Sequence, residues 1–208
     1  IVFDGWSEGI LLGELGAIYS AFVEGRASPL AEPAIQYADF AVWQKHRFSK
    51  DFLQRPLHYW RRNLADVPPA LALPADFPRA DAPTLQGGRH SLALGTELTC
   101  RLTDLARGEG VTLFMVLCAA FLVLLRRYAS QDDVLIGVPT AGRTHAELEG
   151  LIGCFMNVLV LRTDLSGNPT FRELLARVRD TALRAYAHQE VPFEKLVQEL
   201  RPPRDPKR

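Results

Sequence analysis

The sequence of 208 residues has little cysteine, no excess of charge of either sign and no long apolar run. Its three cysteines, Cys100, Cys118 and Cys154, are odd in number and widely spaced, which argues against a disulfide framework and against a metal knuckle. Lys plus Arg equals Asp plus Glu at 24 each, so no overall charge attracts nucleic acid or an anionic membrane. The most apolar run, residues 113–125, is shorter than the roughly 20 residues that span a bilayer and is typical of a buried core helix. We therefore expect a globular protein of the reducing cytoplasm.

Histidine is also sparse, and none of the five histidines has the HxxxH or HExxH spacing of a metal site, so no metal is predicted. The chain opens on "IVFDGWS", without an initiator methionine or the basic start of a signal peptide. Two β-branched residues and a Phe precede an Asp-Gly turn, a pattern that predicts the second half of a β-strand whose first half would lie before Ile1. The opening therefore raises the question of what precedes it.

Helices and strands alternate along the rest of the sequence. Apolar periodicity predicts a helix with one buried face over residues 7–24 (Leu11, Leu15, Ile18 and Phe22), and a second helix over 35–63 that Pro56 kinks or breaks. A proline-rich loop covers 67–88, a strand signal follows at 89–95, and helices are expected at 98–105 and, capped by Thr112, at 113–125. Residues 133–139 and 157–165 are dense in Val, Ile and Leu, as strands covered on both faces tend to be. A capping box at Thr170 and Glu173 opens one helix, and Pro192 opens the last. The fold class is α/β.

Single residues in this pattern leave their roles open. Asp4 fits either a helix cap at a corner or a carboxylate beside a catalytic group, and Arg143 fits either a solvated loop charge or the partner of a buried carboxylate. The tryptophans Trp6, Trp43 and Trp60 are most simply packing residues. Asn157 is equally compatible with a structural and a site role, and His188 is typical of a helix cap. Composition and spacing alone predict no reaction.

Four segments, in order, resemble the core motifs of nonribosomal peptide synthetase condensation domains: "IVFDGWS", "QYADFAVWQ" at 36–44, "IGCFMNVLVLR" at 152–162 and "HQEVPFEKLV" at 188–197. The resemblance extends over essentially the whole chain. It implies the chloramphenicol-acetyltransferase-like, CoA-dependent acyltransferase fold, with two related lobes around a tunnel. Residues 1–30 would end the N-terminal lobe, and 31–208 would form most of the C-terminal lobe. A later Arg-Asp-x-Ser-Arg motif of the family is degenerate or cut here, with Arg204 and Pro206 in its place.

The resemblance also implies roles for individual residues. In the family's His-His-x-x-x-Asp-Gly motif, residues 1–3 are the x positions, so the catalytic histidine would precede Ile1. Asp4 and Gly5 would complete the catalytic motif, Asp4 as an orienting carboxylate paired with Arg143 and Gly5 as a close-approach point for the donor thioester. The substrate tunnel would be shaped by Trp6, Tyr37, Phe40, Trp43 and Asn157, whereas His188 and Gln189 would be structural.

The implied activity is amide-bond formation between a donor acyl or peptidyl thioester and the amine of an acceptor aminoacyl thioester. Both substrates would arrive on phosphopantetheine arms of upstream and downstream peptidyl carrier proteins, next to an adenylation domain, and no cofactor would bind the chain directly. Two alternatives are an epimerization domain of the same superfamily, which the order Asp4-Gly5-Trp6-Ser7 disfavours, and a non-catalytic domain that docks carrier proteins. We expect this stretch of chain alone to be inactive and poorly soluble.

Overall fold

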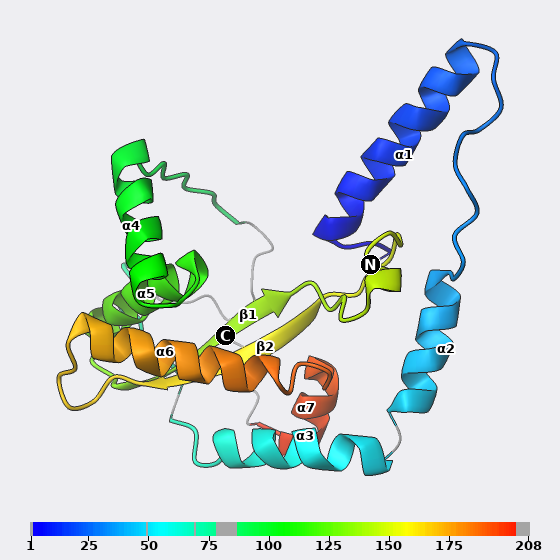
Figure 1. Ribbon diagram of the computed structural model, residues 1–208. Coiled ribbons are helices and arrows are strands. Elements are labelled where there is room, and N and C mark those ends of the chain that lie inside the picture. Colours follow the sequence, from blue (N-terminus) through cyan, green and yellow to red (C-terminus); the bar gives the residue numbers. More distant parts are fainter. Residues whose placement is uncertain (1, 49, 69, 78–86, 203–208) are drawn as a thin grey trace. The chain divides into compact units, whose positions relative to one another are not determined.

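The computed structural model describes residues 2–48, 50–68, 70–77 and 87–202 (Figure 1). Its elements in chain order are α1 (Gly5–Val23), α2 (Tyr37–Arg47), α3 (Lys50–Asn63), α4 (Thr96–Gly108), α5 (Leu113–Ala129), β1 (Asp133–Thr140), the short 3₁₀ helix η1 (Ala146–Leu148), β2 (Asn157–Asp164), α6 (Phe171–Tyr186) and α7 (Phe193–Leu200). Arg204 and Pro206, and with them the late family motif, lie outside the described residues.

The chain divides into two compact units. The first contains residues 1–61, 138–159 and 188–196, and the second contains residues 62–137, 160–187 and 197–208. Strands β1 and β2 pair with each other and contribute residues to both units. The Leu165 N–H donates to the Asp132 carbonyl at one end of the pair, and Thr140 contacts Asn157 at the other, so the two strands run antiparallel.

The second unit is built on α4, α5 and α6, and α5 packs against both of the others. Thr112 caps α5 by accepting a hydrogen bond from Met115 N at 3.2 Å, as predicted. Thr170 and Glu173 form the predicted capping box of α6. Met115, Val116, Leu122 and their apolar neighbours on α5 are buried together with Leu174, Leu175 and Val178 of α6. Phe171, at the first position of α6, is exposed.

Three predictions about the strands are wrong. Residues 2 and 3, the described part of the strand predicted at the start of the chain, and residues 89–95 form no strand, because the described part of the sheet consists of β1 and β2 alone and offers these segments no partner. Burial along β2 alternates between buried residues (Leu159, Leu161 and Thr163) and partly exposed ones. This alternation is the pattern of an antiparallel strand with one covered face and not of a strand buried on both faces.

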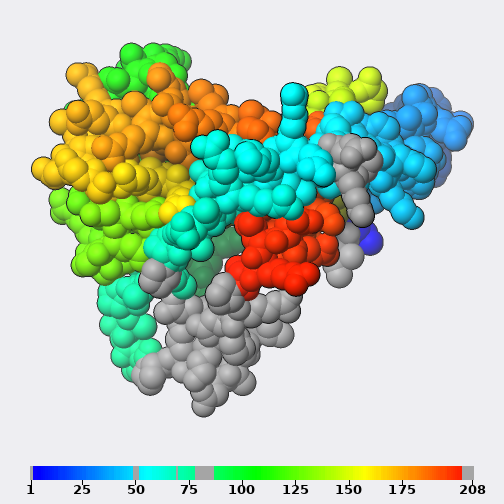
Figure 2. Space-filling model, turned by 90° about the horizontal axis from the view of Figure 1, so that it is seen from below, coloured from blue at the N-terminus to red at the C-terminus, as the bar shows by residue number. Residues whose placement is uncertain are grey.

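The predicted helix over 35–63 is two helices, since α2 ends at Arg47 and α3 begins at Lys50. Pro56 lies inside α3 and does not end it, so the predicted break is misplaced. Proline lacks the N–H that would bond the carbonyl of Phe52, yet α3 tolerates it while burying Leu53, Leu57 and Trp60. Figure 2 shows the outer surface of α3 in cyan, beside α7 in red.

The predicted buried face of the first helix is also wrong for this chain. Leu11, Leu15 and Phe22 of α1 are exposed, as are Leu12 and Tyr19. Among the described residues, no single helix is long and apolar enough to cross a membrane; α4 and α5 meet that test only when taken together, on length and composition, and they are bent by 104°.

Candidate functional site

The first unit brings the start of α1 against the segment that joins β1 to β2. Asp4 caps α1, and its Oδ1 accepts hydrogen bonds from the backbone N–H and the hydroxyl of Ser7, at 2.9 and 2.8 Å. Its Oδ2 accepts from Phe155 N at 3.0 Å, and its backbone N–H donates to the Gly153 carbonyl at 3.1 Å. One residue therefore both starts a helix and ties it to a distant segment of the chain.

Arg143 completes this arrangement. Its Nη2 lies 3.2 Å from Asp4 Oδ1, and the side chains of Arg143 and Asp4 are only 2% and 5% exposed. Arg143 Nη1 donates to the carbonyls of Leu148 and Leu151, and the guanidinium carbon lies 4.1 Å from the centre of the Phe155 ring. A guanidinium stacked on an aromatic face gains a cation–π contact while its edge makes hydrogen bonds. The contact between Asp4 and Arg143, which the resemblance implied, is thus a buried ion pair.

Ser7, to which the sequence pattern assigns no role, is fully buried at the centre of this network. Its hydroxyl can donate to Asp4 Oδ1 or to the Gly153 carbonyl, and it accepts from Gly153 N at 3.0 Å and Arg143 Nη2 at 2.8 Å. A serine three positions after a capping Asp reads only as a first-turn residue. Nothing in the sequence pattern indicates contacts with residues 143 and 153.

The environment of Asp4 sets its protonation. Burial alone would raise the pKa of Asp4, but the hydrogen bonds from Ser7 and Phe155 and the contact with Arg143 outweigh it and lower the pKa from 3.8 to about 2. Asp4 is therefore anionic at neutral pH and far too weak a base to exchange a proton with an amine. The geometry and charge suit an orienting group.

Two glycines permit the close packing around this network. Gly142 has a φ of +65°, and a Cβ there would lie 1.8 Å from the Phe155 carbonyl oxygen. A Cβ on Gly153 would lie 2.2 Å from Cδ2 of Tyr37. Tyr37 in turn donates its hydroxyl hydrogen to the Cys154 carbonyl at 2.9 Å and meets the Phe155 ring edge-on. Residues 142–156 are thereby held between the start of α1 and α2.

A pocket of about 260 Å³ adjoins this corner. We call it the Asp4 pocket; it is lined by Asp4, Gly5, Trp6, Pro139, Thr140, Ala141 and Met156. A Cβ built on Gly5 would meet no described atom within 4 Å, so the backbone at Gly5 faces open space. Trp6 is half exposed and donates its indole N–H to the Glu149 carbonyl at 3.0 Å. In this pocket, the sterically open backbone of Gly5 therefore lies directly beside the hydrogen-bonded carboxylate of Asp4.

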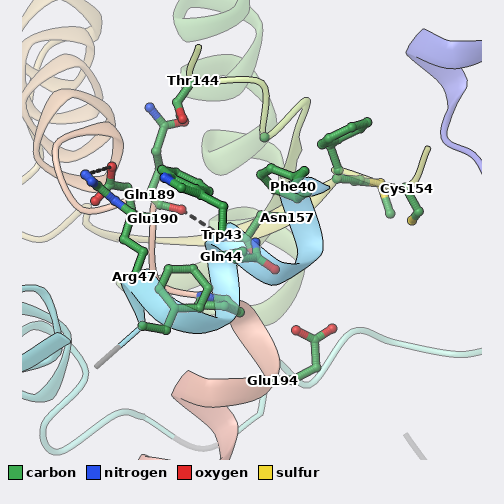
Figure 3. A pocket seen from close by; sticks show the side chains of 15 residues that line it. Phe40, Trp43, Gln44, Arg47, Thr144, Cys154, Asn157, Gln189, Glu190 and Glu194 are labelled. Carbon is green, nitrogen blue, oxygen red and sulfur yellow. Dashed lines mark hydrogen bonds and ion pairs between the residues drawn. The ribbon is translucent and has the colours of Figure 1, made fainter. Parts of the chain in front are cut away.

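A second pocket, of about 270 Å³, lies against α2 (Figure 3). We call it the α2 pocket; its lining includes Phe40, Trp43, Gln44, Arg47, Met156, Asn157, Gln189, Glu190 and Glu194. Phe40 also belongs to a small apolar core with Leu148, Leu151 and Phe155. Of the aromatic residues that the resemblance assigned to a tunnel, Phe40 and Trp43 line the α2 pocket, Trp6 lines the Asp4 pocket, and Tyr37 braces the segment between them.

Asn157 lies at the edge of the α2 pocket, but the protein uses its whole amide group. Its Nδ2 donates to the carbonyls of Gln189 and Val191 at 2.9 and 2.8 Å, and its Oδ1 accepts from Phe193 N and Val158 N. With both donors and both acceptor positions engaged, the amide has no capacity left for a ligand. These contacts favour the structural alternative for Asn157.

Other candidate residues lie apart from the two pockets. The His188 ring stacks on the Tyr59 ring, with the two ring centres 4.0 Å apart. The backbone carbonyl of His188 accepts a hydrogen bond from the indole N–H of Trp60, a residue that is only 1% exposed. Burial raises the pKa of the Cys118 thiol to about 11, so this cysteine is protonated at neutral pH. In the described part of the chain, no group of three or more His, Cys, Asp or Glu side chains could hold a metal ion.

Comparison with known proteins identifies the family. The family model described as "Condensation domain" matches residues 1–208, and the chain therefore belongs to the condensation-domain family. A polypeptide of the linear gramicidin synthase from Brevibacillus parabrevis is 58% identical over 200 residues, which are 96% of this chain and 4% of that protein. The resemblance to nonribosomal peptide synthetase condensation domains is confirmed.

Solved structures agree with this assignment. The X-domain from teicoplanin biosynthesis matches all of this chain and 47% of its own, with a TM-score of 0.89 and 32% identity. The first condensation domain of the calcium-dependent antibiotic synthetase, in complex with a substrate analogue, matches 96% of this chain and 46% of its own, with a TM-score of 0.76 and 28% identity. The chloramphenicol-acetyltransferase-like fold is therefore confirmed, and the chain spans less than half of either structure.

Proposed function

We propose that the protein containing this chain forms an amide bond between a donor acyl thioester and an acceptor aminoacyl thioester. The acceptor amine attacks the donor carbonyl carbon, the C–S bond breaks, and the donor pantetheine leaves as a thiol while the amine loses a proton. Membership of the condensation-domain family supports this reaction. Upstream and downstream carrier proteins would deliver both substrates on phosphopantetheine arms, with an adenylation domain adjacent.

The observation that carries the proposal is the position of Gly5 beside the Asp4 pocket, on a corner fixed by a buried ion pair. Holding two tethered reactants in register removes translational and rotational freedom, which supplies about 7 to 11 kcal/mol in well-oriented reactions. Asp4, Ser7 and Arg143 would keep that corner rigid. The open space at Gly5 would admit the donor thioester, and Trp6, Phe40 and Trp43 would shape the path of the substrates.

Removal of a proton from the acceptor amine would need a group other than Asp4, because a carboxylate whose pKa is about 2 is too weak a base to accept that proton. By the family's His-His-x-x-x-Asp-Gly motif, we infer that a histidine preceding Ile1 would take this role, next to the same corner. A positioned base of this kind contributes roughly 10²- to 10⁴-fold.

The test is a condensation assay with the full-length protein and carrier proteins loaded with donor and acceptor groups. Mass spectrometry should detect a product in which the donor group has moved onto the acceptor amine. The chain of residues 1–208 alone should give no product above the uncatalysed background. Failure of the full-length protein with every loaded pair would overturn the proposed reaction, and turnover by the 208-residue chain alone would overturn the role given to the preceding histidine.

A further inference from the structure

Met156 lies between the Asp4 pocket and the α2 pocket. It lines both, and among the described lining residues it is the one that they share. Its neighbours in the chain are fixed, since Phe155 N donates to Asp4 and the Asn157 amide is held by residues 189–193. Met156 itself is 55% exposed. Because the methionine side chain is flexible and its backbone is fixed, Met156 separates the Asp4 pocket from the α2 pocket by a side chain that can change rotamer.

The α2 pocket has a definite charge. Arg47 forms an ion pair with Glu190, with Nη2 and Oε1 3.2 Å apart, and these two charges offset each other. Glu194 lines the same pocket, apart from that pair in Figure 3, and no ion pair to it occurs among the described residues. The charged groups of the lining therefore sum to one net negative charge, which favours a cationic group over a neutral or anionic one.

We propose that Met156 limits how far an acceptor side chain extends from the Asp4 pocket, and that the α2 pocket is a subsite for a long side chain ending in an ammonium group. This inference rests on the proposed amide-forming function. A volume of about 270 Å³ accommodates an amino-acid side chain, and the aromatic wall of Phe40 and Trp43 suits its methylene stem. Short side chains end at Met156, whereas longer ones must displace it to reach Glu194.

The experiment measures side-chain selectivity in the full-length protein. The parent, Met156→Ala and Met156→Leu are given one donor thioester and a mixture of alanyl, norleucyl and lysyl acceptor thioesters, and the products are quantified by mass spectrometry. Removing the thioether should raise the lysyl-to-alanyl product ratio about tenfold, as side-chain pockets discriminate on that scale. Met156→Leu, which conserves volume, should keep the parent ratio whatever its rate.

A second variant tests the charge. In the Met156→Ala background, Glu194→Gln should bring the lysyl-to-norleucyl ratio down toward one, because the amide keeps the shape and removes the negative charge. If the parent is active and Met156→Ala gives the same product ratios, Met156 does not limit the length of the acceptor side chain. If the preference for lysyl over norleucyl survives Glu194→Gln, the α2 pocket is not a subsite for a cation. Absence of product from the parent with all three acceptors would instead overturn the proposed function, and this inference with it.

Discussion

At the scale of single residues, Asp4 and Arg143 carry opposite charges that are almost completely withdrawn from water. Removing either partner leaves the other charge buried, which typically costs about 3 to 5 kcal/mol of stability. We expect Asp4→Ala and Arg143→Ala each to lower the melting temperature and soluble yield of the full-length protein. The double variant should cost clearly less than the sum, because contacting residues are coupled.

The matched control is Arg107→Ala, which removes one partner of an exposed pair with Asp104. Exposed pairs contribute about 0 to 1 kcal/mol, so this variant should melt like the parent. If Arg143→Ala also melts like the parent, or if the effects of the two alanines simply add, the pair does not stabilise the fold and Asp4 acts only as a helix cap.

Asp4 should also give the protein a specific acid sensitivity. Its pKa in the folded protein, about 2, lies below its ordinary value of 3.8, so the ionised carboxylate adds stability above about pH 4. That contribution, about 2 kcal/mol in full, is lost as the pH falls through 2 and is about half lost at pH 3. Urea unfolding at pH 7 and pH 3 should therefore show the parent losing about 1 kcal/mol more than Asp4→Asn. Equal losses would contradict the lowered pKa.

At the scale of elements, α2 packs against the segment between the strands through the contact of Tyr37 with Gly153. Gly153→Ala would place a methyl group 2.2 Å from Tyr37 Cδ2, and overpacking of this kind costs about 1 to 3 kcal/mol. Thermal unfolding should show this loss, and adding Tyr37→Ala should cost less on the Gly153→Ala background than in the parent. Gly150→Ala is the control, since a Cβ there meets no described atom within 4 Å. Equal melting of the two alanine variants would contradict the tight contact.

At the scale of the whole molecule, α1 presents Leu12, Leu15, Tyr19, Phe22 and Val23 to solvent. Contiguous apolar surface of this kind drives association unless another protein surface covers it. We expect the 208-residue chain expressed alone to be poorly soluble or to form oligomers in light scattering. Replacing Leu15 and Phe22 with Glu should increase the monomeric fraction. A monodisperse parent monomer would show that this surface needs no cover.

The sequence predicted the elements best where a local signal sufficed. Thr112, Thr170 and Glu173 fixed helix starts because a cap depends only on neighbours three residues away. Of the two predicted effects of Pro56, a kink or a break, the break was wrong: α3 continues past Pro56 while burying Leu57 and Trp60, which offsets one lost backbone hydrogen bond. The strand predicted at 89–95 was wrong for a different reason, since β propensity needs a partner strand.

The candidate site followed a similar division. The motifs led to Asp4, Gly5 and Arg143 through the resemblance, whereas residue types and spacing alone left the roles of Asp4 and Arg143 open. Ser7 and Met156 stayed hidden, because the first acts through contacts with residues 143 and 153 and the second through its place between two pockets. Asn157 was left undecided until its four hydrogen bonds were seen.

The sequence by itself determined the family, the helix caps and the balance of charge, because these depend on residue identity and on neighbours a few positions away. Only the tertiary structure decided which charges are buried and which side chains share a cavity. Asp4 is an ordinary turn residue until Arg143, Ser7 and Phe155 surround its carboxylate and lower its pKa to about 2. Burial and long-range hydrogen bonds arise from packing between distant segments, and a linear pattern does not encode them in any local form.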